Sequence, residues 1–312
     1  MSGKPSVAIV GAGRVGTALG ILLRRKGYPI RGVVRRSLAG AKESVRLIGG
    51  GAPHTDPALG AQDADIVLIA VPDDVLQETA AVVRAGRSFR PGELLVHTSG
   101  ALPAAALLDS AESQSGSPGD RPGLLSMHPV QSIAEPVMGA ERLVGAYFGL
   151  EGDIHAVEAG ERLVADIGGR PLKVAPGRKS LYHAAACVAS NYLVTLIDVA
   201  LGLYERAGID REDGLRAIEP LIAATAANAA RLGVPEALTG PIDRGDAETV
   251  RSHLSAMEAF AKGSERDRIE RIYRMLGLDT LGLARRKRGS VSPGHELIER
   301  MLQDRGHQRW SE

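Results

Sequence analysis

The sequence has very little cysteine and few aromatic residues, and both shortages exclude classes of protein. Cys187 is the only cysteine in the 312 residues, so the chain cannot form an internal disulfide framework or a metal site built from several thiolates. Aromatic residues make up only 3% of the chain, which argues against a surface that stacks nucleic-acid bases.

The sequence also lacks an excess of charge of one sign. Its 38 basic and 37 acidic residues leave a formal net charge of +1, which does not support a global basic surface for nucleic acid. Its 8 histidines include no H-x-x-x-H or H-E-x-x-H pair, so no metal site is predicted.

Long hydrophobic runs are lacking as well. Residues 1–5 are short and polar and lead directly into an apolar run followed by glycines, unlike a secretory signal peptide. We find no uninterrupted apolar run of about 18 residues, the length a membrane span needs. These absences predict no membrane partner and a cytoplasmic location.

Glycine, in contrast, is abundant, with 38 residues, and the first half alternates short apolar runs with helical patterns. This alternation is typical of an α/β domain with a parallel sheet. We predict strands at Val7–Val10, Ile30–Val34, 65–71, 93–96, and, from weaker patterns, 124–127, 146–150 and 172–174.

The composition changes after Pro176 and Gly177. Residues 179–206 contain no proline and are apolar around nearly the whole helix circumference, which predicts a buried helix. Further helices are predicted after Asp210, after Asp246 and near 266–276. The predicted fold is therefore a doubly wound, Rossmann-like parallel sheet in 1–176, an all-α domain in 177–284, and a charged, solvated C-terminal tail in 285–312.

A G-x-G-x-x-G pattern follows the first predicted strand and opens a helix. In this context the first glycine permits a tight turn, the second lets the backbone approach a pyrophosphate, and the third allows close helix–strand packing. The free N–H groups at the helix start suit phosphate binding. The predicted cofactor-binding residues here are Gly11, Ala12, Gly13, Arg14, Val15 and Gly16.

The end of the second predicted strand favours one nicotinamide cofactor over the other. An NAD site usually has an acidic residue there, about 20 residues beyond the first glycine, to hold the ribose 2′-hydroxyl. This chain instead has Arg35, Arg36 and Ser37, which suit a 2′-phosphate through charge-assisted hydrogen bonds. We therefore predict NADP as the cofactor.

Later strands end in residues that would face the nicotinamide. Val71 and Pro72 are predicted to form a rigid wall of the cofactor site, because proline has a fixed φ and no N–H. Asp73 and Asp74 are interpreted as caps of the following helix.

The next two predicted strands end in polar residues at the same edge of the sheet. We interpret His97 as a structural histidine whose hydrogen bonds are satisfied inside the domain. Ser99, Gly100 and His128 are predicted contacts of a small-molecule substrate.

These features resemble a known superfamily. The glycine pattern, the segment 70–73 and a helical second domain are similar to the 6-phosphogluconate dehydrogenase-like superfamily, which includes β-hydroxyacid dehydrogenases, ketopantoate reductase, pyrroline-5-carboxylate reductase and prephenate dehydrogenase. The runs 179–194 and 238–246 resemble an uncharacterised bacterial family that pairs a Rossmann-like domain with a helical domain of unknown function. The resemblance covers the chain to about Leu276 and implies a two-domain fold.

The resemblance also implies roles for residues of the helical domain. Relatives carry Lys-x-x-x-Asn, in which the lysine transfers a proton; here Lys179 matches, and His183 replaces the asparagine. Residues four apart share a helix face, so both are candidate catalytic residues. The structural alternative is that Lys179 snorkels at the start of the helix and His183 packs in the core. Further along the chain, Ser190, Asn191 and Arg244 are predicted substrate contacts, with Arg244 alternatively binding backbone carbonyls.

Together these residues predict an NADP(H)-dependent oxidoreductase that transfers hydride to or from a small oxo, hydroxy or imino acid. One alternative is a non-catalytic NADP(H) sensor or interaction module, which the histidine at 183 favours. Another is a reductase that uses a deazaflavin coenzyme with NADP. The small-residue-rich helix from Lys179 predicts a homodimer, since relatives commonly dimerise through such helices.

Overall fold

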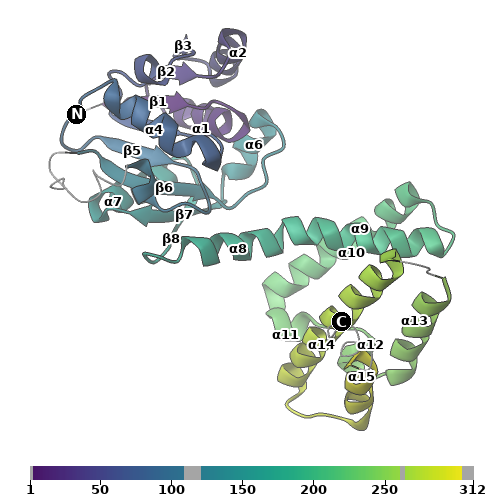
Figure 1. Cartoon of the computed structure of the whole chain (residues 1–312). Coiled ribbons are helices and arrows are strands. Elements are labelled where there is room, and N and C mark those ends of the chain that lie inside the picture. The colour runs from purple at the N-terminus through teal and green to yellow at the C-terminus, as the bar shows by residue number, and fades with distance from the viewer. Residues whose placement is uncertain (1–2, 109–120, 261–263, 304–312) are drawn as a thin grey trace. The chain divides into compact units, whose positions relative to one another are not determined.

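The chain folds into two compact units, Met1–Tyr192 and Leu193–Glu312. The computed structural model describes residues 3–108, 121–260 and 264–303, with the side chains of 260 and 264–267 left out (Figure 1). We describe each unit by itself.

The first unit contains an eight-stranded sheet in the order β3-β2-β1-β4-β5-β6-β7-β8. All neighbouring strands are parallel except β6 and β7, which are antiparallel. The strands are β1 (Val7–Val10), β2 (Ile30–Val34), β3 (Ala52–His54), β4 (Ile66–Ile69), β5 (Leu94–His97), β6 (Gly123–Pro129), β7 (Tyr147–Gly152) and β8 (Arg170–Lys173).

Helices cover both faces of this sheet, which explains why its central strands are continuously apolar. In β1, Val7 and Ile9 pack into one buried cluster with the helices α1 (Arg14–Arg25) and α7 (Ile154–Asp166). Ala8 and Val10 pack into a second cluster with α4 (Leu76–Ala85). The predicted doubly wound α/β fold is confirmed. The helical elements are α1 (Arg14–Arg25), α2 (Leu38–Ile48), α3 (Pro57–Gly60), η1 (Asp73–Val75), α4 (Leu76–Ala85), η2 (Ala104–Leu107), α6 (Pro136–Leu143), α7 (Ile154–Asp166) and α8 (Lys179–Ala189).

Two details of the sheet were not predicted. Strand β3 has three partly or fully exposed residues, including Pro53, so it lacks the apolar run of a central strand. The reversal at β7 was also missed, because a buried strand has the same composition whichever way its neighbour runs.

The second unit is helical, as predicted. The Asp210 carboxylate accepts a hydrogen bond from the Glu212 N–H and caps α10 (Arg211–Leu232), which contains Pro220. The Asp246 carboxylate accepts one from the Thr249 N–H at the start of α13 (Ala247–Phe260). The helices are α9 (Asn191–Arg206), α10 (Arg211–Leu232), α11 (Val234–Ala237), α12 (Pro241–Arg244), α13 (Ala247–Phe260), α14 (Ser264–Arg288) and α15 (Pro293–Gln303).

The prediction of one buried helix over residues 179–206 was wrong. The helix is interrupted at Ser190, and only Lys179 in α8 and Val199 and Leu201 in α9 are buried. The reason is that α8 is covered along one stripe only, while residues 191–196 at the start of α9 are all exposed, so much of the apolar circumference is left uncovered. The segment Lys179–Arg206, with mean hydropathy 1.7, is also long and apolar enough to span a membrane by length and composition alone, contrary to the prediction that no such segment exists.

The prediction of a solvated tail from residue 285 was also wrong. Helix α14 continues to Arg288, and α15 buries His295, Ile298 and Leu302. Lys287 and Arg288 pair with the buried carboxylate of Asp243, and Arg285 pairs with Glu299. The basic run thus has acidic partners within its own unit, which the local sequence could not reveal. Residues 304–312 of the predicted tail lie outside the described residues.

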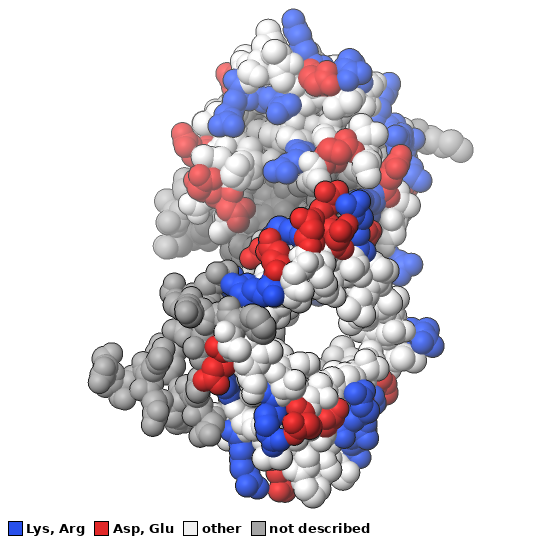
Figure 2. Space-filling model, turned by 90° about the vertical axis from the view of Figure 1, so that its right-hand side faces the viewer, with Lys and Arg blue, Asp and Glu red and all other residues white. Residues whose placement is uncertain are grey.

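Charged side chains of both signs are interspersed on the face drawn in Figure 2, in keeping with the neutral composition. The face has no broad area of one sign among the residues that the structure describes. This distribution gives no support to a nucleic-acid surface on that face.

Candidate functional site

The glycine-rich turn between β1 and α1 has the geometry that its sequence predicts. Gly11 has φ +86°, and a Cβ there would lie 2.6 Å from Val71 Cγ1. A Cβ on Gly16 would lie 2.6 Å from the Gly11 carbonyl oxygen, whereas Gly13 has no neighbour closer than 4.0 Å. Thus the first and third glycines are needed for packing, and the second leaves open space for a ligand.

The start of α1 can accept an anion. It has no side-chain cap and no acidic residue in its first turn, where Arg14 and Val15 follow the turn. The turn itself is held in place because the Ala12 carbonyl accepts hydrogen bonds from Thr17 Oγ1 at 2.8 Å and Ser44 Oγ at 2.9 Å. A rigid turn with open backbone N–H groups at a helix start is suited to phosphate.

At the end of β2, the structure brings Arg35, Arg36 and Ser37 to the start of α2. The Ser37 hydroxyl accepts a hydrogen bond from the Gly40 N–H and caps this helix, which has no acidic residue in its first turn. Arg35 is partly buried, and Arg36 is exposed. These groups can hold a phosphate, and Ser37 can donate its hydroxyl hydrogen while it caps.

The end of β4 contacts the glycine-rich turn through Val71, as expected for a wall of the same site. The interpretation of Asp73 and Asp74 as helix caps was wrong. Both lie inside the 3₁₀ turn η1, and neither η1 nor α4 has a side-chain cap. Pro72 occupies the N-cap position of η1 and Val75 that of α4, so neither aspartate lies at a capping position.

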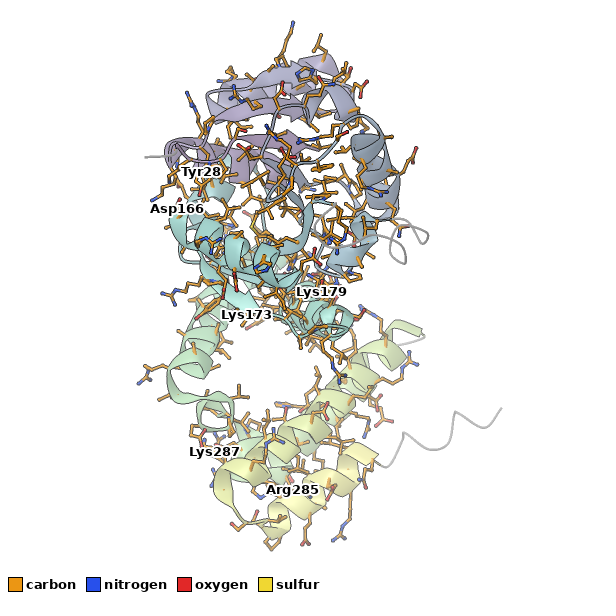
Figure 3. The ribbon with its side chains drawn as sticks, turned by 90° about the vertical axis from the view of Figure 1, so that its left-hand side faces the viewer. Tyr28, Asp166, Lys173, Lys179, Arg285 and Lys287 are labelled. Atoms are coloured by element: carbon orange, nitrogen blue, oxygen red, sulfur yellow. The ribbon has the colours of Figure 1, made fainter. Side chains whose placement is uncertain are left out.

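Lys179 is the most unusual residue of this edge of the sheet. It begins α8 (Figure 3), is only 2% exposed, and donates a hydrogen bond of 3.1 Å to the Ser99 carbonyl beyond β5. Burial lowers its pKa to about 8, because a dehydrated site disfavours the ammonium, and the carboxylates of Glu151 and Asp73 oppose this shift. A lysine of this kind can exchange a proton near neutral pH.

Ser99 contributes its backbone more than its side chain. Its carbonyl also accepts a hydrogen bond from Ser126 Oγ at 3.2 Å, while its own hydroxyl oxygen accepts hydrogen bonds from the N–H groups of Ala101 and Leu102. With the side chain 7% exposed, Ser99 fixes a turn and positions Lys179.

His97 has a structural role, as interpreted from the sequence. Its Nδ1 accepts a hydrogen bond from the Ser99 N–H, and its Nε2 lies 3.1 Å from the Pro103 carbonyl. Burial lowers its pKa to about 4, and nearby Lys179 adds to this shift. The ring is therefore neutral at pH 7.

His128 lies beside a residue that the sequence did not single out. Its Nδ1 is 2.8 Å from the Tyr182 hydroxyl, and the two rings meet edge to face at 5.6 Å. Tyr182 lies one helical turn after Lys179, whose ammonium is 5.1 Å from the Tyr182 ring centre. The three-residue spacing from Lys179 on one helix face was the available signal for Tyr182.

His183 completes this group. Its ring lies 5.8 Å from that of His128, and a Cβ at Gly100 would come within 2.4 Å of His183 Cδ2 and 2.8 Å of His128 Nε2. Gly100 is thus required by these two rings. Cys187 Sγ is 3.8 Å from His183 Nδ1.

The remaining predicted site residues are placed differently. Ser190 and Asn191 are exposed at the junction of α8 and α9, and Arg244 is exposed in the second unit. The structure therefore brings together Lys179, His183, Ser99, Gly100 and His128, and none of the others is shown in contact with them. No group of three metal-ligating side chains occurs in the described part of the chain.

A glycine-rich turn at the carboxyl edge of a doubly wound sheet, followed by a helical unit, defines a Rossmann-like protein with a helical C-terminal region. Residues 2–116 match the Rossmann-like domain family, and residues 146–280 match the family described as a domain of unknown function, DUF2520. The chain thus pairs these two domains, as the sequence resemblance predicted. No curated protein matches the sequence.

Solved structures share the whole architecture. A Bacteroides fragilis protein provisionally named an NADP oxidoreductase is 21% identical, with a TM-score of 0.67 over 89% of this chain and 98% of its own. An imine reductase from Myxococcus stipitatus in complex with NADP⁺ is 18% identical, with a TM-score of 0.57 over 90% of this chain and 93% of its own.

A pyrroline-5-carboxylate reductase from Coxiella burnetii is 16% identical, with a TM-score of 0.56 over 94% of this chain and 98% of its own. At such identities the likeness is one of fold. The shared fold is the two-domain fold that the sequence resemblance implied.

Proposed function

We propose that this chain is an NADP(H)-dependent oxidoreductase that transfers hydride to or from a small oxo, hydroxy or imino acid. The observation that carries the proposal is the dehydrated Lys179, held by the Ser99 carbonyl at the same edge of the sheet as the open glycine-rich turn. A nicotinamide-dependent reductase needs a turn that can hold phosphate and a group that exchanges a proton near neutral pH. Here the glycine-rich turn and Lys179, whose pKa is near neutral pH, lie at one edge of the sheet.

The residues present fit the cofactor. The open Gly13 and the uncapped start of α1 would hold the pyrophosphate, and Arg35, Arg36 and Ser37 would hold the 2′-phosphate of NADP. The bound cofactor would supply or accept the hydride.

Lys179 would then handle the proton of the reaction. Reduction of a carbonyl or imine places a proton on oxygen or nitrogen, and Lys179, with a pKa of about 8, carries that proton at pH 7. His183 is the second candidate proton donor. Ser190, Asn191 and Arg244 remain proposed substrate contacts.

The proposal is tested by a screen of oxo and imino acids that follows NADPH absorbance. Lys179→Ala should lower kcat at least about 100-fold on any substrate found, the usual scale of acid–base catalysis. The control is Lys173→Ala, because Lys173 is exposed and paired with Glu161. Turnover of Lys179→Ala at the wild-type rate would overturn the catalytic role, and NADPH binding without any turnover would favour a sensor.

Cofactor choice is tested by titration with NADPH and NADH. Wild-type protein should bind NADPH at least about 10-fold more tightly, and the double variant Arg35→Ala/Arg36→Ala should lose this preference while its NADH affinity is unchanged. Arg25→Ala, at the far end of α1, is the control. Equal wild-type affinity for the two cofactors would contradict the assignment of Arg35 and Arg36.

We also propose a homodimer formed through the apolar surface of α8. One stripe of α8, with Lys179, Tyr182 and His183, is the less exposed side, whereas Leu181 and Val188 are 65% and 58% exposed. These two residues are seven apart and share a helix face, so a second copy could cover both. Such a cover would also leave this surface unavailable to a bilayer, in keeping with the proposed cytoplasmic location.

Light scattering tests the dimer. Wild-type protein should have twice the 32.7 kDa chain mass, and Leu181→Glu/Val188→Glu should have that of one chain. Leu59→Glu, at an exposed apolar residue of α3, should leave the wild-type mass unchanged. A wild-type mass of one chain would overturn the proposal.

A further inference from the structure

The residues around Tyr182 and His128 fix the position of the Tyr182 ring. Tyr182 packs over Gly149 of β7, the residue that pairs with His128 across the antiparallel strands, and a Cβ at Gly149 would lie 2.4 Å from the Tyr182 hydroxyl. The ring of Tyr182 thus has one position, with its hydroxyl 2.8 Å from His128 Nδ1. The fit explains why this position of β7 is a glycine.

The hydrogen atoms of this pair can be assigned from its partners. Burial raises the pKa of Tyr182 to about 12, against the opposing effect of the Gly149 backbone, so the hydroxyl keeps its own hydrogen. That hydrogen has two acceptors, His128 Nδ1 at 2.8 Å and the His128 carbonyl at 3.5 Å. The shorter contact is the better hydrogen bond, so Nδ1 is the acceptor.

The other ring nitrogen of His128 must then carry a hydrogen. Burial lowers the pKa of His128 to about 4, and the neighbouring Lys179 and His183 add to this shift, so the ring is neutral and has a single N–H. This N–H is on Nε2, which lies beside Gly100 and His183 and has no hydrogen-bond partner among the described residues.

We propose that His128 is a neutral hydrogen-bond donor, through Nε2, to an oxygen of the substrate, and that Tyr182 is the positioning residue that fixes this tautomer. The proposal rests on the proposed oxidoreductase function for the identity of the acceptor. The two residues then have different roles in the site. Lys179 transfers the proton, and His128 polarises or orients the substrate oxygen without changing its own charge. A neutral donor is favoured here because a second cation beside Lys179 would be costly in a dehydrated site.

The tautomer can be measured without any activity. In full-length protein with ¹⁵N-labelled histidine, long-range ¹H–¹⁵N NMR at pH 7 should show His128 protonated on Nε2 alone, with the signals assigned by their loss in His128→Gln. Tyr182→Phe should give a mixture of tautomers, because Nδ1 loses its donor. Protonation of His128 on Nδ1 in the wild type, or an unchanged spectrum in Tyr182→Phe, would overturn the proposal even if the protein proves to be a reductase.

Kinetics on a substrate found by the screen give the second readout. Tyr182→Phe should lower kcat/KM about 10-fold with unchanged NADPH affinity, the scale of one lost hydrogen bond. His128→Gln, whose amide can donate from a similar position, should retain more activity than His128→Ala. Tyr192→Phe, at a 60% exposed tyrosine, is the matched control and should match the wild type. Equal activity of His128→Ala and wild type would contradict the donor role and leave the function of Lys179 untouched.

Discussion

His97 is a buried residue whose two hydrogen bonds require one protonation state. Its Nδ1 accepts from Ser99 and its Nε2 donates to Pro103, so only the neutral ring fits. Its pKa falls from 6.5 in the unfolded chain to about 4 in the fold. The unfolded chain therefore binds more protons between these values, and the free energy of unfolding should fall by roughly 3 kcal/mol as the pH is lowered from 6.5 to 4.

Denaturant unfolding at several pH values measures this loss. His97→Asn should be less stable than the wild type at pH 7 and should lose less stability on acidification, because the titrating ring is gone. His155→Asn is the control, since that side chain is 97% exposed. Parallel pH curves for wild type and His97→Asn would contradict a buried neutral ring at this position.

At the scale of residues, the sequence reveals a residue when its role depends on a recognisable local pattern. The glycines of the turn were identified because their roles depend on near neighbours in the chain, and Lys179 was identified because it matches the Lys-x-x-x-Asn pattern of the relatives that the sequence resembles. Tyr182 was missed because its role depends on Gly149, a residue that only the antiparallel pairing of β6 and β7 brings opposite His128. Likewise, the Ser99 carbonyl holds Lys179 across 80 residues of sequence.

At the scale of elements, the turn before α1 has one glycine that is needed for packing, Gly16, and one that leaves space for a ligand, Gly13. Gly16→Ala should destabilise the fold by roughly 1–3 kcal/mol, because its Cβ would lie 2.6 Å from the Gly11 carbonyl oxygen. Gly13→Ala should leave thermal stability near that of the wild type and still weaken NADPH binding, since its Cβ would project into open space. Melting curves and NADPH titrations on both variants measure the two effects.

Gly282→Ala controls for a glycine replaced in a helix, where nothing lies within 4 Å of the new methyl group. Full NADPH affinity in Gly13→Ala would argue against the pyrophosphate lying at this turn. The strands β1 and β2 were predicted to the residue because both are mostly buried and apolar, whereas the edge strand β3 was not predicted, since it has no apolar run.

On the scale of the whole molecule, the last residues that the structure describes are part of the second unit's core. Ile298 of α15 is fully buried with Val250 and Leu302, whereas its neighbour Leu297 is 38% exposed. The sequence suggested a solvated tail because charges dominate 285–288; their partners, Asp243 and Glu299, lie elsewhere in the chain.

Ile298→Ala should therefore lower the free energy of unfolding of the second unit by roughly 2–4 kcal/mol, as for other buried isoleucines, while Leu297→Ala should cost far less. Hydrogen exchange with mass spectrometry can assign the loss to a unit. Peptides from α13, α14 and α15 should exchange faster in Ile298→Ala, and peptides from the sheet of the first unit should exchange as in the wild type. Equal effects of the two variants, or faster exchange in the sheet as well, would mean that α15 does not stabilise the second unit in this way. Equal effects of Ile298→Ala and Leu297→Ala would mean that Ile298 is not a core residue of the second unit. Faster exchange in the sheet would mean that the two compact units unfold as one.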